Sequence, residues 1–280
     1  MYGIDVAEND GSVNWAEVKN SGKIFAFVKA TEGKTLKDGL FSHHWPTIKK
    51  YDIARGAYHF FHPRTSQPID QAHAFLKTVG NLTPGDLPPV LDVETTDNQD
   101  VDQEQANIGS TDRNNIINEI KQWLKVVEDA IQQQTGKKIR PIIYTGFNFW
   151  QNILGDPHDF ADYPLWIAHY GVQTPSIPAS WGSGNWLIHQ YRGDVPNVPG
   201  VSNQADLNRF NSFQLGSKGS IVKGIQQRLK DFKKPEFDPV NVDGHFTSQT
   251  EKAVIAFQKS HKLQADGIVG LKTWLQLLWG

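Results

Sequence analysis

The 280-residue chain contains no cysteine, so it has no disulfide framework, no thiol nucleophile and no thiolate metal site. It also lacks any run of about 18 apolar residues, and we therefore expect no membrane-spanning helix. No basic stretch followed by an apolar run opens the sequence, so we expect no signal peptide. The formal net charge of -2 gives no basic field that would attract nucleic acid or an anionic membrane.

Length and composition favour one large soluble domain followed by a small one. The chain is long for a single domain of about 100–200 residues and short for two large ones. The hydrophobic fraction of 38% and the charged fraction of 21% are ordinary for a soluble globular protein. Nine tryptophans and seven tyrosines are many for this length. Aromatic rings fill cores, but they also stack on sugar rings.

Strand and helix patterns alternate early in the chain, and strands dominate later. Helices are predicted at 13–20, 41–51, 68–79 and 116–131. Short apolar runs rich in β-branched residues predict strands at 2–6, 23–33, 56–62, 90–94, 142–144, 165–168 and 186–191. This order predicts an α/β fold, namely a (β/α) barrel whose final helices are missing.

The composition changes after Phe213, where residues 215–219 (Leu-Gly-Ser-Lys-Gly) form a predicted hinge. Three amphipathic helices are expected beyond it, around 221–229, 253–257 and 271–278. An Asp-Gly pair followed by Thr, seven positions after the Asp, occurs twice in this stretch. No catalytic constellation is visible there. We therefore expect a small all-α, three-helix binding domain over 214–280, after a catalytic domain over 1–213.

Two carboxylates mark the predicted strand at 90–94. Side chains alternate along a strand, so Asp92 and Glu94 point to the same side. If that side lines a pocket, mutual repulsion raises one pKa and leaves a proton donor beside an ionised partner, as glycoside hydrolysis requires. Strand ends form the mouth of such a barrel, and the polar stretch 95–114 is expected to hang over it. The alternative is a strand end whose acids lie in solvent or cap the next helix.

Several segments together resemble glycoside hydrolase family 25, the lysozymes of the Chalaropsis type. Their order and spacing over 1–213 carry the resemblance, and they are Gly3–Val6, Phe27–Gly33, Tyr58–Phe60, Leu91–Glu94, Ile143–Thr145, Leu165–Ala168, His189–Tyr191 and Ala205–Asn208. The resemblance implies a TIM-like barrel of the (β/α)5(β)3 type. The tail resembles a peptidoglycan-binding-1 domain in 215–219, 242–244, 253–258 and 265–270.

The resemblance also implies roles for four acids. Glu94 is expected to be the general acid. Asp92 would either position and polarise the substrate's 2-acetamido group or act more directly. Asp5 and Asp206, from the first and last strands, would complete a ring of acids suited to a transition state with positive charge on the sugar. The alternative for Asp5 and Asp206 is a buried aspartate that caps a turn.

Aromatic residues near strand ends are candidates for a saccharide groove, with core packing as the alternative for each. Lys29 is included among the candidates, although an ion pair with Glu32 is favoured over direct contact with substrate. His59, His62 and His73 do not have the spacing of a helical metal-binding pair, so we expect no metal and no cofactor. The substrate-binding candidates are Tyr58, Phe60, Tyr144, Trp166, Tyr191 and Lys29.

These inferences predict a lysozyme, an endo-N-acetylmuramidase that hydrolyses the β-1,4 bond between N-acetylmuramic acid and N-acetylglucosamine in bacterial peptidoglycan. A phage endolysin or a bacterial autolysin, tethered to the wall by its tail, fits this prediction. We expect a monomer whose partner is peptidoglycan, with no nucleic acid and no membrane partner. The alternatives are a non-catalytic cell-wall-binding protein and a hydrolase of another N-acetylated glycan such as chitin.

Overall fold

Eight strands close into a barrel in the computed structural model, which describes residues 1–95, 110–239 and 241–280. The strands pair in the order β1-β9-β8-β7-β6-β5-β4-β2, and β2 pairs back with β1. Strand β9 is antiparallel to both of its neighbours, and the other barrel pairs are parallel. The barrel strands are β1 (Tyr2–Val6), β2 (Lys23–Glu32), β4 (Ala54–Phe60), β5 (Val90–Asp92), β6 (Ile142–Gly146), β7 (Leu165–Ala168), β8 (Ile188–Pro196) and β9 (Gln204–Phe210).

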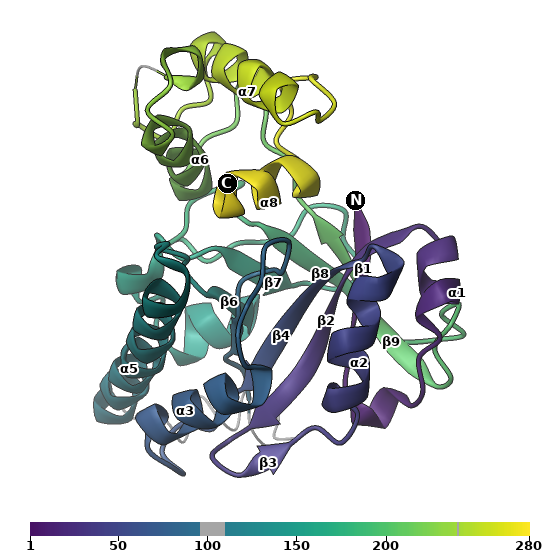
Figure 1. Ribbon diagram of the computed structural model, residues 1–280. Helices are drawn as coiled ribbons and strands as arrows, with labels where there is room; N and C mark the ends of the chain where they lie inside the picture. Colours follow the sequence, from purple (N-terminus) through teal and green to yellow (C-terminus); the bar gives the residue numbers. More distant parts are fainter. Residues whose placement is uncertain (96–109, 240) are drawn as a thin grey trace.

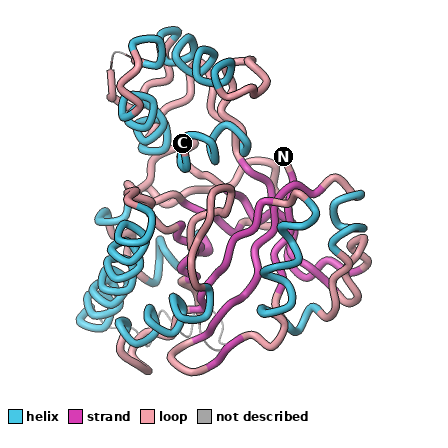
Figure 2. The backbone as a smooth tube through the Cα atoms, in the orientation of Figure 1, coloured by secondary structure: helices cyan, strands magenta, loops and turns pink. Residues whose placement is uncertain are grey.

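Helices cover the outside of the barrel between its early strands (Figures 1 and 2). They are α1 (Trp15–Asn20), α2 (Phe41–Ile48), α3 (Pro68–Val79) and α5 (Ser110–Thr135). Local signals fix their starts, because the Asn14 side chain accepts from the first-turn amides of α1 and Pro68 opens α3. A short strand, β3 (Leu36–Lys37), pairs with the end of β2.

Several element boundaries differ from the sequence-based expectation, and those of β5 and α5 bear on the site. The strand predicted over 90–94 ends at Asp92, because the amide of Val93 makes the last inter-strand bond, to Tyr144 O at 2.9 Å, and Glu94 lies beyond it. Helix α5 begins at Ser110 rather than near 116. Most of the polar stretch 95–114, expected over the barrel mouth, lies outside the described residues.

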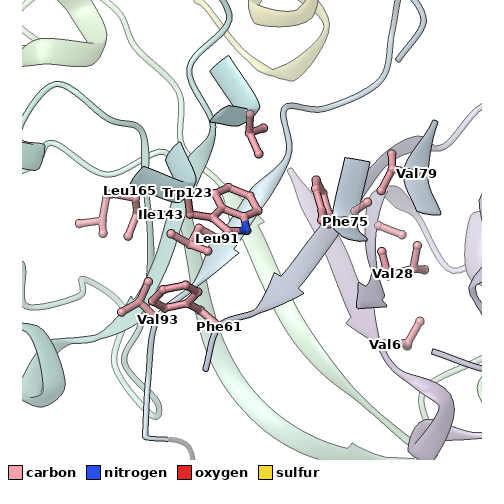
Figure 3. Packing of buried hydrophobic residues seen from close by; sticks show 14 of the residues in the cluster. Val6, Val28, Phe61, Phe75, Val79, Leu91, Val93, Trp123, Ile143 and Leu165 are labelled. Carbon is pink, nitrogen blue, oxygen red and sulfur yellow. The ribbon is translucent and has the colours of Figure 1, made fainter. Parts of the chain in front are cut away.

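The core between barrel and helices explains why Asp92 faces inward. Leu91 and Val93 are almost fully buried in it and pack with Phe61 and Trp123 (Figure 3). Because neighbouring side chains in a strand point to opposite faces, burying Leu91 and Val93 outside the barrel turns Asp92 toward its interior. The alternation predicted from the sequence is therefore present.

The C-terminal helices close the end of the barrel at which the parallel strands begin. They are α6 (Ser220–Asp231), α7 (Ser248–Ser260) and α8 (Leu271–Trp279), and Figure 1 shows them beside the N-terminus. Phe213 and Val269 exchange two backbone hydrogen bonds, and the rings of Phe210 and Trp274 lie 5.7 Å apart. A single apolar cluster runs from the barrel into the tail. The predicted hinge at 215–219 is tied by backbone bonds to residues 244–246.

The sequence repeat in the tail folds around two buried glutamines. Gln226 accepts from the amide of Gly244 at 2.8 Å and donates to Thr250 at 3.2 Å. Gln258 makes the same contacts with Gly267 at 2.9 Å and Thr273 at 3.1 Å. Each Asp-Gly turn is thus fastened to a helix by one glutamine. No helix in the described part of the chain has the length and apolar character to cross a membrane.

Candidate active site

A cavity of about 160 Å³ opens at the end of the barrel where the parallel strands finish. Every barrel strand supplies at least one lining side chain, either from within the strand or, for Glu94, from two residues past its end. The lining residues are Asp5, Lys29, Tyr58, Phe60, Val90, Asp92, Glu94, Tyr144, Trp166, Gln190 and Asp206. Four carboxyl groups therefore share one small cavity, at the end of the barrel where active sites of this architecture lie.

Asp92 and Glu94 form a hydrogen-bonded pair of carboxyl groups. Burial raises the pKa of Glu94 to about 7, against the opposing effects of the Asp92 hydrogen bond and the Lys29 charge. Burial, followed by repulsion from Glu94, raises the pKa of Asp92 well above its usual range. The pair therefore holds a proton near neutral pH. Within the described residues, no N–H or hydroxyl group donates to the buried Oδ1 of Asp92, so its only carboxyl partner is Glu94.

Gln190 joins the other two acids across β8. Its Nε2 donates to Asp5 Oδ1 at 3.0 Å and to Asp206 Oδ2 at 2.9 Å. Its Oε1 accepts from the hydroxyls of Tyr144 and Tyr170, each at 2.8 Å. The side chain is 1% exposed, and both of its N–H donors and both of its acceptor lone pairs are in use. Gln190 consequently fixes the separation and orientation of both carboxylates.

Burial raises the pKa of Asp5 well above its usual range, and the charge of Asp206 raises it further. Hydrogen bonds from Asn208 and Gln190 oppose this shift by stabilising the ionised form. Burial also raises the pKa of Asp206 to about 6, although the backbone amide of Asp194 donates to it at 2.7 Å. Asp206 is thus mostly ionised at neutral pH, whereas Asp5 depends on its amide donors to carry a charge.

Trp166 and Asn208 extend this network below the cavity. The indole Nε1 of Trp166 donates to Asn208 Oδ1 at 2.9 Å, and Asn208 Nδ2 donates to Asp5 Oδ1 at 2.5 Å. Trp166 also packs against Tyr144 with ring centroids 4.9 Å apart. Its side chain is only 2% exposed, so this tryptophan supports the floor of the cavity and offers little open face to a sugar.

Lys29 lines the cavity with the four acids and also pairs with Glu32, which in turn contacts His62. It forms the ion pair with Glu32 that the sequence favoured, and Glu32 also contacts His62 at 3.1 Å. The Lys29 ammonium lies 4.9 Å from the Phe60 ring centroid. The Lys29 charge lowers the pKa of Glu94, as it does that of Asp92. Lys29 is therefore the cation that limits the electrostatic cost of collecting acids in the cavity.

The structure brings all but one of the predicted site residues to the cavity. Tyr191 is the exception, because it does not line this cavity. It follows inward-facing Gln190 in β8, so it points to the outside, where its ring meets Tyr2 at 6.1 Å. Gln190, Asn208 and Tyr170 were missed. The segment His189–Tyr191 was noticed in the sequence, and strand alternation would have selected Gln190 instead of Tyr191.

Two of the three histidines considered as metal ligands, His59 and His62, have other partners. Both ring nitrogens of His59 are engaged, Nδ1 with Thr31 at 2.8 Å and Nε2 with Gln71 at 3.0 Å. Burial lowers the pKa of His59 to about 4, and the ring stacks on Trp123. In the described part of the chain, no group of three or more His, Cys, Asp or Glu side chains is arranged to hold a metal ion.

Comparisons with known proteins match both the barrel and the tail. A model of glycosyl hydrolases family 25 matches residues 4–201, and a model of a peptidoglycan binding domain matches residues 218–277. Lysozyme M1 of Streptomyces globisporus is 33% identical, over 75% of this chain and 68% of its own length. The autolytic lysozyme of Clostridium acetobutylicum is 32% identical, over 98% of this chain and 77% of its own length.

A solved structure extends the comparison to three dimensions. The crystal structure of the bacterial lysozyme from Streptomyces coelicolor superposes with a TM-score of 0.63 at 32% identity, covering 75% of this chain and 92% of that one. The matched share corresponds in size to the barrel rather than to the whole chain. Sequence, fold and the family model agree, and the chain belongs to the glycosyl hydrolases of family 25.

Proposed function

We propose that this protein is a lysozyme, an endo-N-acetylmuramidase that hydrolyses the β-1,4 bond between N-acetylmuramic acid and N-acetylglucosamine in bacterial peptidoglycan. The observation that carries the proposal is the pair of hydrogen-bonded carboxyl groups, Asp92 and Glu94, at the barrel mouth. Family membership supports the reaction type, and the matched peptidoglycan binding domain supports the substrate.

In this proposal Glu94 donates its proton to the glycosidic oxygen as the bond to the anomeric carbon breaks. A pKa of about 7 suits a group that is protonated at the start of the reaction and ionised at the end. Water supplies the hydroxyl group that ends on the anomeric carbon. The remaining proton of that water passes to Glu94, which is then protonated again as at the start of the reaction.

Asp92 acts on the substrate beside the breaking bond. Its carboxyl group lines the cavity and suits the N–H of a 2-acetamido group, the one polar substituent that distinguishes N-acetylated sugars from plain hexoses. Asp5 and Asp206 lie across the cavity and stabilise the positive charge that develops on the sugar ring. Tyr58, Phe60, Tyr144, Trp166 and Lys29 are proposed to shape the site around the saccharide.

The proposal extends to the organisation of the chain. Residues 1–213 form the catalytic barrel, of the (β/α)5(β)3 type, and residues 214–280 form a three-helix peptidoglycan-binding domain. The order of elements supports the barrel type, since helical segments follow only the earlier strands and β7, β8 and β9 come in succession. The protein would act as a monomer on the cell wall, as a phage endolysin or a bacterial autolysin would.

The test is hydrolysis of purified cell walls by the wild type and by Glu94→Gln. We expect the substitution to reduce clearing of a wall suspension by about 10²-fold or more, because it removes the acid while preserving shape. Glu236→Gln, an exposed change in the tail, is the matched control. Equal clearing by wild type and Glu94→Gln would remove Glu94 from the acid role.

Mass spectrometry of the released fragments separates the proposal from its alternatives. A muramidase leaves N-acetylmuramic acid at each new reducing end. N-acetylglucosamine at that end would contradict the proposed bond specificity. Cleavage of chitin in preference to wall would assign the enzyme to another N-acetylated glycan, and wall binding without any cleavage would make it a non-catalytic binding protein.

A further inference from the structure

A second cavity, of about 380 Å³, lies between the C-terminal helices and the barrel. Its walls come from α6, α8 and the segments that lead into β6 and β7, so it lies at the end of the barrel away from the acid-lined cavity. Cross-links hold these walls together. Ser220 Oγ donates to Ala161 O at 2.7 Å, and Arg228 Nη2 donates to Lys138 O at 3.1 Å. The cleft is therefore a fixed feature of the folded chain.

Positive charge exceeds negative charge in this cleft. Four cationic side chains and two acids line it. One acid, Asp162, pairs with Arg140 at 3.3 Å, and the other, Asp231, accepts from Gln227. Lys138, Lys223 and Arg228 make no ion pair with any residue that the structure describes. The charge of Asp231 acts on Arg228, so the cleft has a net excess of two cations, Lys138 and Lys223, and an anionic ligand would relieve their repulsion.

The floor between these cations is apolar. Ile221, Ile225 and Leu277 form it together with Trp274, whose side chain is 8% exposed. A neutral sugar would need an open aromatic face, and Trp274 does not supply one. A short peptide with small aliphatic side chains and free carboxylates matches both the floor and the charge.

We propose that this cleft binds the stem peptide of peptidoglycan through its carboxylates. The inference rests on the proposed function, and it assigns recognition of peptide to the tail and recognition of glycan to the barrel. Because the two cavities lie at opposite ends of the barrel, the bound peptide belongs to a neighbouring strand and not to the sugar being cleaved. Binding would hold the enzyme in the wall while leaving the mouth free for a new glycan.

Calorimetric titration of the full chain with a soluble stem tetrapeptide, Ala-γ-Glu-Lys-Ala, tests the proposal. We expect binding by the wild type, weakened by added salt. The double variant Lys138→Glu, Lys223→Glu should bind at least tenfold more weakly, because it reverses two of the cations. Lys230→Glu, an exposed change on α6 outside the cleft, is the matched control and should bind within about twofold of wild type.

Absence of binding at millimolar peptide, or equal affinities in the double variant and the control, would overturn the proposal. Binding of a glycerol phosphate polymer without binding of the peptide would also overturn it, in favour of a phosphate-bearing wall polymer. Hydrolysis of a soluble peptide-free glycan is measured separately. Peptide binding without glycan hydrolysis would refute the proposed catalytic activity while leaving the cleft assigned.

Discussion

The side-chain amide nitrogen of Gln190 donates one hydrogen bond to Asp5 at 3.0 Å and another to Asp206 at 2.9 Å. One neutral side chain thereby stabilises two carboxylates whose mutual repulsion would otherwise favour protonation. This arrangement keeps negative charge beneath the position where the sugar becomes positive in the proposed reaction.

Replacing Gln190 by Glu should therefore impair catalysis without leaving a cavity at this position. The new side chain has the same shape but lacks the two N–H donors, so Asp5 and Asp206 lose their shared partner. We expect kcat on a soluble glycan to fall by about 10²-fold, with a smaller change in KM. Removing one preorganised hydrogen-bond donor from an enzyme active site typically has an effect of this size.

The control is Gln132→Glu on the exposed face of α5, which should leave kcat within about twofold. A purely structural role predicts that Gln190→Glu lowers activity in parallel with the folded fraction. Unchanged kcat in a fully folded Gln190→Glu protein would show that the bridge is dispensable.

Lys29 should set the upper pH limit of activity. Glu94 must be protonated to act as an acid, so kcat/KM is expected to decline as the pH rises through about 7. The Lys29 charge lowers that pKa, so Lys29→Met should shift the decline to higher pH. Initial rates on a soluble glycan across the pH range measure the shift.

Glu32→Gln separates the charge of Lys29 from its ion pair. It removes the partner that holds Lys29 while keeping the cation, so it should change the pH limit less than Lys29→Met does. A shift to lower pH in Lys29→Met would contradict the electrostatic role assigned to this residue.

Stability should increase when Glu94 becomes neutral. Its folded-state pKa is raised from 4.5 to about 7, so its favourable contribution is complete below about pH 4.5 and is lost as the pH rises through 7. Glu94→Gln should therefore raise the free energy of unfolding by up to about 3 kcal/mol near pH 8, and by nearly nothing near pH 4.

Urea unfolding of both proteins at the two pH values gives this difference. Both proteins contain the same histidines, such as His59 with its pKa lowered to about 4. The contribution of these histidines to the pH dependence of stability therefore cancels when the variant is compared with wild type. Equal stabilisation at both pH values would point to packing rather than to the charge of Glu94.

Barrel and tail should unfold together. Trp274 lies against Phe210 in an apolar cluster that both parts share, so Trp274→Ala should destabilise the whole chain by about 3–5 kcal/mol. Calorimetry should show a single transition shifted to lower temperature. The exposed Lys272→Ala on the same helix should change the free energy of unfolding by less than about 0.5 kcal/mol. Two separate transitions, with only one shifted, would indicate an independent tail on a hinge.

The sequence by itself determined the strand that carries the paired acids, and it indicated the family. Alternation in 90–94 placed Asp92 and Glu94 on one side because the period of a strand is fixed by backbone geometry. The tail helices were predictable for a similar reason, since their apolar spacing is local. The repeated Asp-Gly turns were visible too, but not the glutamines that hold them, Gln226 and Gln258.

Only the tertiary structure decided which residues meet across the barrel. Gln190 and Asp5 are 185 positions apart, and their contact depends on the closure of β8, β9 and β1. Tyr191 lies at a register shift between β8 and β9, where its ring meets Tyr2, and the sequence alone does not locate such an irregularity. The tail docks against the barrel through apolar surfaces, and the cationic cleft forms where they meet. Local sequence patterns do not show which of these surfaces pack together. Contacts of this kind depend on the packing of distant segments, and local sequence does not encode them.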